Sequence, residues 1–422
     1  MQLNLKGKTV LLGVTGSISA YKACDLARLF VKAEADVHVV MTPAAERFVS
    51  ALTFEALTRN PVLTEKSESW SSELNHIEIG KKCDVFVIAP ATANTINKLS
   101  KGIADNILTQ TALAYAKEIV IAPAANTNML SNHYTTGSIK MLKLNDYAIV
   151  EPQEKLLACG DTGSGALAEP IEIFYATAKA LMRDPFWEDR RVVVTGGGTR
   201  EKIDEVRYIS NFSSGKMANA IALSLYLKGA DVCYITSTGN DGLPQDIYTI
   251  DVESTEELLD YTQDALRVAK KGKMSRASLN TPDAIELIQK RPYLFMVAAV
   301  SDYTPKFPQN GKMKKTMLGE AWSIELKQTP DILSSLNKDG VTVVGFKAEM
   351  DEQNGLANAK GLLEQKEIDA VCYNLLKDAG SFGTSDNEIT FITKTGTTDL
   401  GKADKLTLAD KILTHAEGLV NE

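Results

Sequence analysis

Polar residues follow the ends of several apolar segments in the first half of the chain. Gly16, Ser17 and Ile18 connect an apolar stretch at residues 9–13 to a helical pattern. Glycine lets a backbone approach an anion, and the first amides of a helix donate hydrogen bonds to it. Because the turn is not G-x-G-x-x-G, it favours the phosphate of a mononucleotide over a dinucleotide. A tight strand-to-helix turn without any ligand would use the same residues.

Two later strand ends carry amide and hydroxyl side chains. Thr92 and Asn94 follow an apolar segment at residues 84–89, and Asn126 follows another at residues 118–122. In open α/β sheets, ligands bind beyond the carboxyl ends of the strands. Helix capping by Thr92 and Asn94, or closure of a turn by Asn126, is the alternative interpretation.

His76 and Cys159 are the titratable candidates of this half. His76 follows Asn75 in a polar stretch, and Cys159 precedes a stretch at residues 160–165 with three glycines. An imidazole can exchange protons near neutral pH, and a thiol in a loop can donate one. Lone histidines and cysteines are also common as structural residues without chemical roles.

The second half has its own set of candidates. Residues 195–198 read Thr-Gly-Gly-Gly and predict a turn after a strand. Ser213, Ser214 and Gly215 precede a helical pattern, so they predict an anion site. Asp302 follows an apolar segment, and Lys312 opens a basic run, Lys-Met-Lys-Lys. No G-x-x-x-x-G-K-[ST] motif is present, so this is not a P-loop. The basic run would also suit a solvated loop.

These residues must be positioned by an alternation of strands and helices. In the first half we expect strands at residues 9–13, 36–41, 84–89 and 118–122, and helices at 19–32, 93–101, 105–116 and 171–182. The segments at 84–89 and 118–122 are apolar on both faces, which is typical of strands buried in a parallel sheet. The first half is therefore predicted to be a doubly wound α/β domain.

The same pattern restarts after a proline and a charge cluster near residue 185. Strands are expected at residues 191–195, 231–236, 293–300, 341–346 and 370–373, and helices at 216–228 and 405–416. Residues 270–290 are polar and predict an inserted surface loop plus helix. The sequence thus predicts two doubly wound, Rossmann-like α/β domains, residues 1–183 and 191–422, joined by a linker at 184–190.

Composition limits the classes of protein. The chain has 422 residues, of which 44% are hydrophobic, with a net charge of −8 from 46 basic and 54 acidic residues. This balance argues against nucleic-acid binding. The longest apolar runs have about seven residues, whereas a membrane span needs about 20. Five cysteines without C-x-x-C and four scattered histidines indicate neither a disulfide framework nor a zinc site. We expect a cytoplasmic protein that is not bound to a membrane.

Taken together, the motifs of the first half, residues 16–18, 75–77, 90–94, 123–129 and 158–160, occur in the order of a known family. Residues 6–182 closely resemble the flavin-dependent cysteine decarboxylases, and among them the phosphopantothenoylcysteine decarboxylases. The resemblance implies a flavodoxin-like flavoprotein domain that forms trimers and holds FMN at a subunit interface. One departure is Ala166, where the family usually has arginine, and it places the anchoring of the loop in doubt.

The resemblance also implies roles for single residues. His76 would reach the flavin of a neighbouring subunit as an acid/base, Asn126 would bind the substrate carboxylate beside Met129, and Cys159 would protonate the intermediate. FMN would be held by Gly16, Ser17, Ile18, Thr42, Thr92, Ala93 and Asn94.

Residues 190–420 resemble the phosphopantothenate–cysteine ligases, most specifically through residues 195–217. The resemblance implies a dimerising domain that uses CTP and Mg²⁺ and proceeds through an acyl-cytidylate. Asn211 would stabilise that intermediate, and Lys312 would meet the triphosphate. Where the family often has a second lysine this chain has Leu362, and Lys360 would substitute for it. The substrate-binding residues would be Gly197, Ser213, Ser214, Gly215, Asp302, Pro330, Asp331, Ile332, Phe346, Lys360 and Lys366.

Both resemblances together imply two consecutive steps of coenzyme A biosynthesis, with 4′-phosphopantothenate, cysteine and CTP as substrates. Trimers of the first domain joined by dimers of the second would give a homo-oligomer, a dodecamer. One alternative is a flavin-binding regulatory protein without catalysis. Another is an oxidoreductase that takes NADPH through the second half, against which the absence of G-x-G-x-x-G argues.

Overall fold

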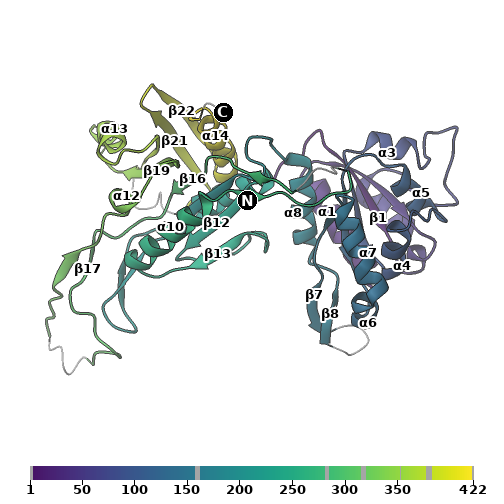
Figure 1. Ribbon diagram of the computed structural model, residues 1–422, viewed down its shortest axis with the longest axis horizontal. Helices are drawn as coiled ribbons and strands as arrows, with labels where there is room; N and C mark the ends of the chain where they lie inside the picture. The colour runs from purple at the N-terminus through teal and green to yellow at the C-terminus, as the bar shows by residue number, and fades with distance from the viewer. Residues whose placement is uncertain are drawn as a thin grey trace. The chain divides into compact units, whose positions relative to one another are not determined.

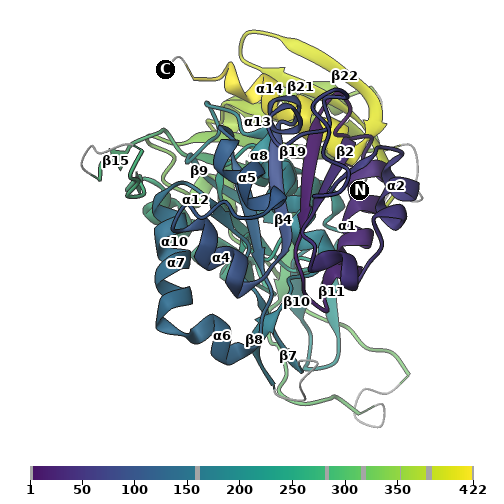
Figure 2. The same ribbon diagram turned by 90° about the vertical axis from the view of Figure 1, so that its right-hand side faces the viewer.

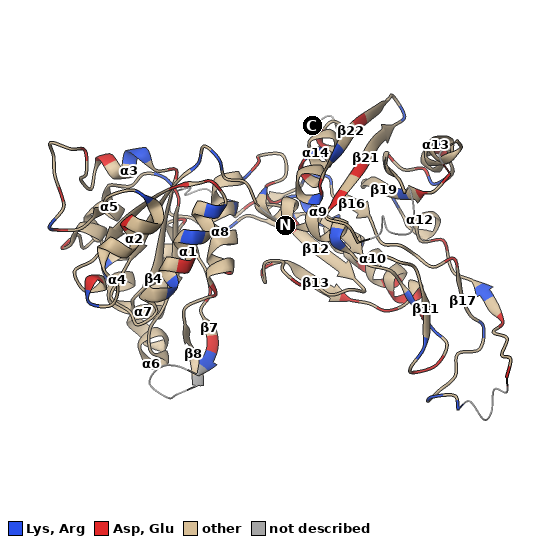
Figure 3. Ribbon diagram, turned by 180° about the vertical axis from the view of Figure 1, so that it is seen from behind, with Lys and Arg blue, Asp and Glu red and all other residues tan. Residues whose placement is uncertain are grey.

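The computed structural model describes residues 3–156, 162–280, 285–314, 320–351, 353–376 and 383–420. The chain forms two compact units. The N-terminal unit consists of Gln2–Arg183 and Ser275–Glu286, and the C-terminal unit of Asp184–Met274 and Leu287–Glu422. Acidic and basic residues are interspersed along the elements of each unit (Figure 3).

The N-terminal unit is built on a six-stranded parallel sheet with the order β3-β2-β1-β4-β5-β6. Its strands are β1 (Thr9–Val14), β2 (Asp36–Met41), β3 (Val62–Leu63), β4 (Val85–Ala91), β5 (Ile119–Pro123) and β6 (Ala148–Ile149). Without the two-residue β3, this is the 2-1-3-4-5 order of flavodoxin-like sheets. The predicted doubly wound α/β fold is confirmed.

Helices cover both faces of this sheet. On one face α1 (Ala20–Lys32) packs against α2 (Ala51–Thr58) and α8 (Pro170–Met182). On the other, α4 (Ala93–Leu99) packs against α5 (Ile107–Ala114) and α7 (His133–Leu144). Figure 2 shows α4, α5 and α7 on one side of β4 and α1 and α2 on the other. The remaining elements of this unit are η1 (Ala45–Arg47), α3 (Glu78–Lys82), α6 (Thr127–Ser131), β7 (Gln153–Leu156) and β8 (Thr162–Ala166).

A two-stranded hairpin, β7–β8, extends from the N-terminal sheet beside α6 (Figure 1). A Cβ on Gly165 would lie 2.2 Å from the carbonyl oxygen of Ala125, so only glycine lets the hairpin come this close. The amide of Ala125 donates to the carbonyl of Gly165 at 3.1 Å. The hairpin is therefore held against the loop that follows β5.

The C-terminal unit has an eight-stranded sheet with the order β13-β12-β9-β16-β19-β20-β21-β22, in which β21 and β22 run antiparallel to their neighbours. Its strands are β9 (Arg191–Gly196), β12 (Asp231–Thr236), β13 (Tyr248–Asp251), β16 (Tyr293–Met296), β19 (Thr342–Glu349), β20 (Ala370–Leu375), β21 (Asp386–Thr393) and β22 (Thr397–Asp404). Its helices are α9 (Lys216–Leu227), α10 (Thr255–Ala269), α12 (Ile332–Ser335), α13 (Gly355–Gln365) and α14 (Lys405–Glu417).

Two layers of helices also enclose this second sheet. α9 packs against α14, whereas residues of α10, α12 and α13 share one apolar core with Val193 and Val343 of the sheet. Three small two-stranded sheets complete the unit: β10 (Arg200–Lys202) with β11 (Tyr208–Ser210), β14 (Lys273–Met274) with β15 (Leu287–Ile288), and β17 (Tyr303–Pro305) with β18 (Leu326–Gln328). None of the described helices is both long and apolar enough to cross a membrane.

Residues 184–190, which we expected to be a linker, are a packed part of the C-terminal unit. The side chain of Trp187 is fully buried, and its Nε1 donates a 2.7 Å hydrogen bond to Glu417. Its ring packs edge-on against Tyr293, with the ring centres 4.9 Å apart. Arg190 is also buried, and its Nη1 donates to the carbonyl of Arg291 at 2.7 Å. The aromatic burial explains why this segment is not a free connection.

The insertion at residues 270–290 also differs from the predicted loop plus helix. Its two ends pair as β14 and β15, and no helix occurs in its described residues. Ser275–Glu286 belongs to the N-terminal unit, although we expected residues 191–422 to form one domain. There the amide of Leu279 donates to the carbonyl of Leu144 at 2.7 Å, and the Ser278 hydroxyl donates to Asp146 at 2.7 Å.

Candidate functional sites

A cavity of about 880 Å³, here called the N-terminal cavity, lies at the carboxyl ends of β1, β2, β4 and β5. The chain leaves β1 towards β2 on one side and later returns to β4 on the other, so a crevice opens between the strand ends. Nine sequence-predicted residues line it: Gly16, Ser17, Ile18, Thr42, Thr92, Ala93, Asn94, Asn126 and Met129.

The turn after β1 needs glycine for a steric reason. A Cβ on Gly16 would lie 2.5 Å from the Cβ of Ala44, closer than real side chains approach. Glycine therefore lets this turn lie against the segment after β2, which carries Thr42. The Ser17 hydroxyl accepts a 3.2 Å hydrogen bond from the amide of Ser19, immediately before α1 begins at Ala20. The start of a 13-residue helix thus faces the cavity.

Thr92 joins two strand ends to α4. Its hydroxyl caps α4 by accepting from the amide of Thr95 at 3.3 Å. Its own amide donates to the Thr15 hydroxyl at 3.1 Å, and that hydroxyl donates to the carbonyl of Pro90 at 2.6 Å. Thr92 therefore caps α4, as the alternative interpretation predicted, and it also lines the cavity. Asn94, the second residue of α4, is exposed at the cavity.

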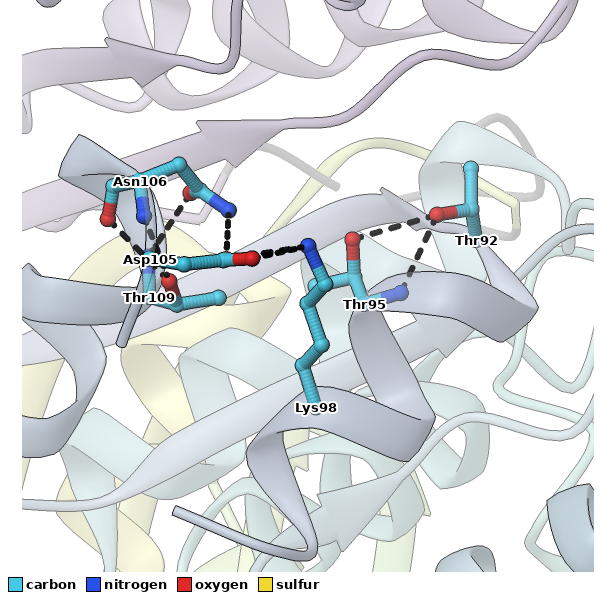
Figure 4. Close-up of polar contacts among 6 residues, drawn as sticks. All are labelled: Thr92, Thr95, Lys98, Asp105, Asn106 and Thr109. Carbon is cyan, nitrogen blue, oxygen red and sulfur yellow. Dashed lines mark hydrogen bonds and ion pairs between the residues drawn. The ribbon is translucent and has the colours of Figure 1, made fainter. Parts of the chain in front are cut away.

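A lysine that we did not predict also lines the N-terminal cavity. The ammonium of Lys98 donates to both carboxylate oxygens of Asp105, at 2.9 and 2.7 Å (Figure 4). The Asn106 side chain donates to the same carboxylate at 3.1 Å and caps α5 with its oxygen. The hydrogen bond from Lys98 lowers the pKa of Asp105. This pair joins the end of α4 to the start of α5 and places a cation beside the predicted ligand residues.

Asn126 and Met129 reach the cavity from the end of β5. The Asn126 side-chain oxygen caps α6 by accepting from the amide of Asn128 at 2.9 Å. Half of the Met129 side-chain surface is exposed. The hairpin β7–β8 adds Lys155 and Ala166 to the lining. Lys22 lines the cavity as well, and no sequence motif pointed to either lysine.

The two lysines meet at one carboxylate. Glu169 forms ion pairs with Lys155 and, at 3.5 Å, with Lys22. The hydrogen bond from Lys155 lowers the pKa of Glu169, although partial burial opposes this. Cys159, predicted as a proton donor, lies outside the described residues.

His76 does not line the N-terminal cavity of its own chain. Its Nδ1 lies 2.6 Å from Oε1 of Glu68, a contact that predicts an Nδ1–H donor and leaves Nε2 as the acceptor. The ring also meets the edge of the Trp70 ring, with centres 5.6 Å apart. We did not predict this contact with Glu68, because Glu68 lies eight residues away within a polar stretch.

A smaller cavity of about 150 Å³, here called the C-terminal cavity, lies at the carboxyl ends of β9 and β19. Five predicted residues line it: Gly197, Ser213, Ser214, Gly215 and Phe346. Gly197 and Gly215 both have positive φ angles, +81° and +68°. A Cβ on Gly197 would lie 2.3 Å from the Ser237 hydroxyl. Both the backbone conformation and the lack of space therefore require glycine at position 197.

Sequence reasoning missed much of the polar lining of the C-terminal cavity. Its further polar residues are Lys216, Lys347, Asn374, Asn387 and Lys405. They come from five different elements: α9, β19, β20, β21 and α14. No local pattern could have joined them, because only the sheet order brings β20 and β21 beside β19.

Asn211 and Asp302 lie outside the lining of the C-terminal cavity. The Asn211 amide donates to the carbonyl of Val300 at 2.9 Å, which ties the loop after β11 to the segment after β16. The Asp302 carboxylate is exposed, and its carbonyl accepts from the amide of Thr329 at 3.0 Å. The Asn211 side chain is therefore bound to the backbone after β16, whereas the Asp302 carboxylate faces solvent.

Lys312 is exposed, but the backbone beside it is anchored. Asp204 accepts from the amide of Met313 at 3.2 Å and pairs with the guanidinium of Arg207 at 2.5 Å. The same guanidinium donates to the carbonyl of Met313 at 3.1 Å and lies 5.1 Å from the centre of the Trp322 ring. The Arg207 hydrogen bond keeps the pKa of Asp204 well below its usual range.

The predicted Pro330–Lys366 group is partly assembled. The Asp331 side chain caps α12 by accepting from the amide of Ser334 at 3.0 Å, and Asp331 pairs with Lys366. Ile332 is buried, whereas Lys360 is exposed on α13. Neither lysine lines a cavity described above. Within the described ranges, no three His, Cys, Asp or Glu residues are clustered as metal ligands.

Comparisons with known proteins agree with this two-unit organisation. The model of the Flavoprotein family matches residues 1–182, and the model of the DNA/pantothenate metabolism flavoprotein C-terminal domain matches residues 187–278 and 277–419. The coenzyme A biosynthesis bifunctional protein CoaBC of Haemophilus influenzae is 36% identical over 100% of this chain and 98% of its own length. That of Bacillus subtilis is 37% identical over 98% of both chains.

Solved structures are similar to single units of the chain. The FMN-binding protein AtHal3 is 35% identical, covers 40% of this chain and 94% of its own, and has a TM-score of 0.36. The C-terminal domain of a CoaBC protein is 28% identical, covers 55% of this chain and 96% of its own, and has a TM-score of 0.42. From the full-length identities and the two family models, the chain belongs to the family of bifunctional coenzyme A biosynthesis proteins.

Proposed function

We propose that the chain catalyses two consecutive reactions of coenzyme A biosynthesis in the cytoplasm. The C-terminal unit would join cysteine to 4′-phosphopantothenate at the expense of CTP. The N-terminal unit would then convert the phosphopantothenoylcysteine to 4′-phosphopantetheine and CO₂, with FMN as cofactor. Membership of the bifunctional family supports this order of activities, since the product of the ligase is the substrate of the decarboxylase.

The observation that carries the decarboxylase assignment is the composition of the N-terminal cavity. Residues from four strand ends, far apart in the sequence, line one space of about 880 Å³. The donor set suits FMN, because the turn at Gly16 and the start of α1 offer amides for a phosphate. The hydroxyl of Ser17 and the amide of Asn94 add polar partners, and Lys98 adds a cation.

The chemistry requires an electron acceptor because loss of CO₂ from an N-acylated cysteine leaves a carbanion without a sink. When bound, FMN would accept two electrons from the thiol, so that a thioaldehyde conjugated to the breaking bond takes up the carbanion charge. The two electrons return in the last step, so the overall reaction is redox-neutral. The protein therefore has to bind the carboxylate, exclude water and move protons.

Three residues of the N-terminal unit would perform these tasks. Asn126, at the cavity, would donate its amide to the departing carboxylate. His76, oriented by Glu68, would exchange a proton with the substrate thiol through Nε2. Cys159 would donate the proton that the enethiolate intermediate takes up when it is reduced to the thiol product.

Because His76 lies outside the cavity of its own chain, a second copy would have to supply it. Apolar side chains at the cavity suit such an interface, since Ile18 and Tyr21 each have 59% of their surface exposed. We propose trimers of the N-terminal unit, joined by dimers of the C-terminal unit into a dodecamer.

In the C-terminal unit, the carboxylate of 4′-phosphopantothenate would attack the α-phosphate of CTP and release pyrophosphate. The amine of cysteine would then displace CMP from the acyl-cytidylate. The amides after Gly215 and the ammonium of Lys312 would neutralise phosphate charge, and Asn211 would hydrogen-bond the acyl-cytidylate. Mg²⁺ would bind through the triphosphate and supply further charge neutralisation.

The test is to incubate the purified full chain with 4′-phosphopantothenate, cysteine and CTP. We expect CMP, pyrophosphate, CO₂ and 4′-phosphopantetheine, with ATP a much poorer cosubstrate. Phosphopantothenoylcysteine supplied directly should yield CO₂ without CTP. Release of neither CMP nor CO₂ by a flavin-loaded protein would instead favour the non-catalytic regulatory alternative.

A further inference from the structure

Lys405, the first residue of α14, is a buried cation at the C-terminal cavity. Only 6% of its surface is exposed, and it lines the cavity. Its ammonium donates to the backbone carbonyls of Thr384 and, at 3.4 Å, of Asp386. In the described part of the chain, no carboxylate forms an ion pair with it. The protein thus holds a positive charge against neutral carbonyl oxygens.

This placement is unfavourable for an ammonium in three ways. Burial removes it from water, which lowers the pKa of Lys405, and the charge of Lys216 lowers it further against the attraction of Asp386. The residue also begins a 13-residue helix, whose N-terminus repels cations. A cation kept at such a position indicates an anionic partner, since perturbed groups in cavities cluster at functional sites.

Two other groups converge on the same space. Lys216 begins α9 and lines the cavity, and its ammonium donates to the carbonyl of Gly383 at 2.6 Å. The amides at the start of this 12-residue helix follow Ser213, Ser214 and Gly215, which also line the cavity. Two ammonium groups and a helix N-terminus therefore surround a space of about 150 Å³.

We propose that Lys405 and Lys216 together bind a phosphoryl group of a ligase substrate at the N-terminus of α9. The inference rests on the proposed ligase function and deepens it. A phosphoryl group carries up to two negative charges, accepts several hydrogen bonds and would draw both lysines away from the backbone carbonyls they now contact. Two substrates bring such a group, CTP in its triphosphate and 4′-phosphopantothenate in its monoester.

The two sources are separated by binding measurements on the full-length protein. Dissociation constants are measured by calorimetry for CTP, cytidine, 4′-phosphopantothenate and pantothenate, with wild type, Lys405→Gln and Lys216→Gln. Glutamine keeps a hydrogen-bond donor but removes the charge. Lys411→Gln is the matched control, because Lys411 lies on the same helix and donates to the carbonyl of Leu400 without lining the cavity.

We expect each cavity variant to weaken one phosphorylated ligand by about ten- to a hundredfold and to leave its unphosphorylated counterpart unchanged. A loss for CTP alone identifies the triphosphate, and a loss for 4′-phosphopantothenate alone identifies the monoester. Lys405→Gln should also melt at the same or a higher temperature without ligand, because it removes a buried charge.

Unchanged affinities for both phosphorylated ligands would overturn the inference, as would equal losses for cytidine or pantothenate. A wrong ligase assignment would give a different result, because the wild-type protein would then bind neither CTP nor 4′-phosphopantothenate.

Discussion

A histidine can exchange a proton usefully only if its tautomer is fixed. In this chain Glu68 accepts from Nδ1 of His76 and, at 3.4 Å, from its backbone amide, so one carboxylate restrains both the ring and the chain. The Trp70 ring packs perpendicular to the imidazole, with the ring centres 5.6 Å apart. Nε2 is therefore the nitrogen left for proton exchange in the proposed mechanism, because Nδ1 is bound to Glu68.

Glu68→Gln should lower the rate constant of decarboxylation by about ten- to a hundredfold, as for other carboxylates that orient histidines. A glutamine can present an N–H to Nδ1 and favour the wrong tautomer. Glu68→Asp should recover part of the activity. Rates of CO₂ release and of ligation are measured for both variants, and ligation should not change. Glu78→Gln, in the helix directly after His76, is the control. Equal losses in that control would show that charge alone is responsible.

The anchor beside Lys312 gives a second prediction. Asp204 is buried, pairs with Arg207 and binds the backbone of Met313, so Asp204→Asn should loosen the lysine-bearing segment. We expect the KM for CTP to rise several-fold while decarboxylation of supplied phosphopantothenoylcysteine stays unchanged. An unchanged KM for CTP would show that the position of Lys312 does not depend on Asp204.

The same anchor has a defined pH dependence. The folded pKa of Asp204 lies well below its unfolded value of 3.8, so the pair stabilises the C-terminal unit fully above about pH 4. This contribution is lost as the pH falls from there towards the folded pKa. Asp204→Asn should therefore have a lower free energy of unfolding than wild type at neutral pH. The difference between the two free energies should become smaller in acid. Urea unfolding at pH 7 and pH 3 measures both differences.

At the scale of elements, the hairpin β7–β8 has an electrostatic anchor. Glu169 precedes α8 without capping it and pairs with Lys155 of the hairpin and Lys22 of α1. Lys155 is the cation that the hairpin contributes to this contact. Through Glu169, the hairpin that lines the N-terminal cavity is connected to α1 on the sheet.

Glu169→Gln should therefore weaken closure of the hairpin. Because partly exposed ion pairs contribute at most about 1 kcal/mol, we expect no more than about a fivefold loss of kcat/KM for decarboxylation. The flavin absorbance should be retained, since the turn after β1 is untouched. Glu154→Gln, which removes the neighbouring exposed charge on β7, is the control. An effect of equal size in both variants would count against the anchor.

The elements that sequence could predict are those with local signals. The strands at residues 36–41 and 231–236 are confirmed at both ends, because apolar runs between polar residues set them. The strand expected at 293–300 ends at Met296. Beyond it the amides of Val297 and Ala298 donate to the Thr195 hydroxyl and not to a neighbouring strand. The apolar sequence therefore continues past the last hydrogen bond of the β-sheet.

The candidate site residues, like the strands and helices, could be predicted only where the local sequence carries a signal. Residues in strand-to-helix turns, such as Gly16 and Thr92, could be predicted because glycine and capping residues mark those turns. Lys98 with Asp105, and Lys155 with Glu169, are contacts between different elements, and nothing local identifies them. Lys405 is similar, because its burial depends on β20 and β21 lying beside β19.

At the scale of the whole molecule, each unit has an apolar cluster of its own. The apolar cluster of the N-terminal unit joins residues from Leu11 to Leu142 and contains none from the segment Ser275–Glu286. That segment contributes polar contacts, chiefly from Ser278 and Asn280 to Asp146, at 2.7 and 2.8 Å. Such hydrogen bonds contribute about 1 kcal/mol each, a small part of the 5–15 kcal/mol that stabilises a typical domain.

A fragment that ends at Arg183 should therefore fold without the rest of the chain. We expect it to unfold cooperatively, to retain flavin absorbance and to release CO₂ from supplied phosphopantothenoylcysteine. In the full chain, Asp146→Ala removes the same polar contacts and should leave that rate within about twofold. The complementary fragment should begin at Asp184, because Trp187 and Arg190 are buried in the C-terminal unit. A fragment beginning at Arg191 lacks these side chains and should be insoluble or less stable. If the first fragment is insoluble while the full chain is not, the segment Ser275–Glu286 is required for folding of the N-terminal unit, and the division of cores drawn here is wrong.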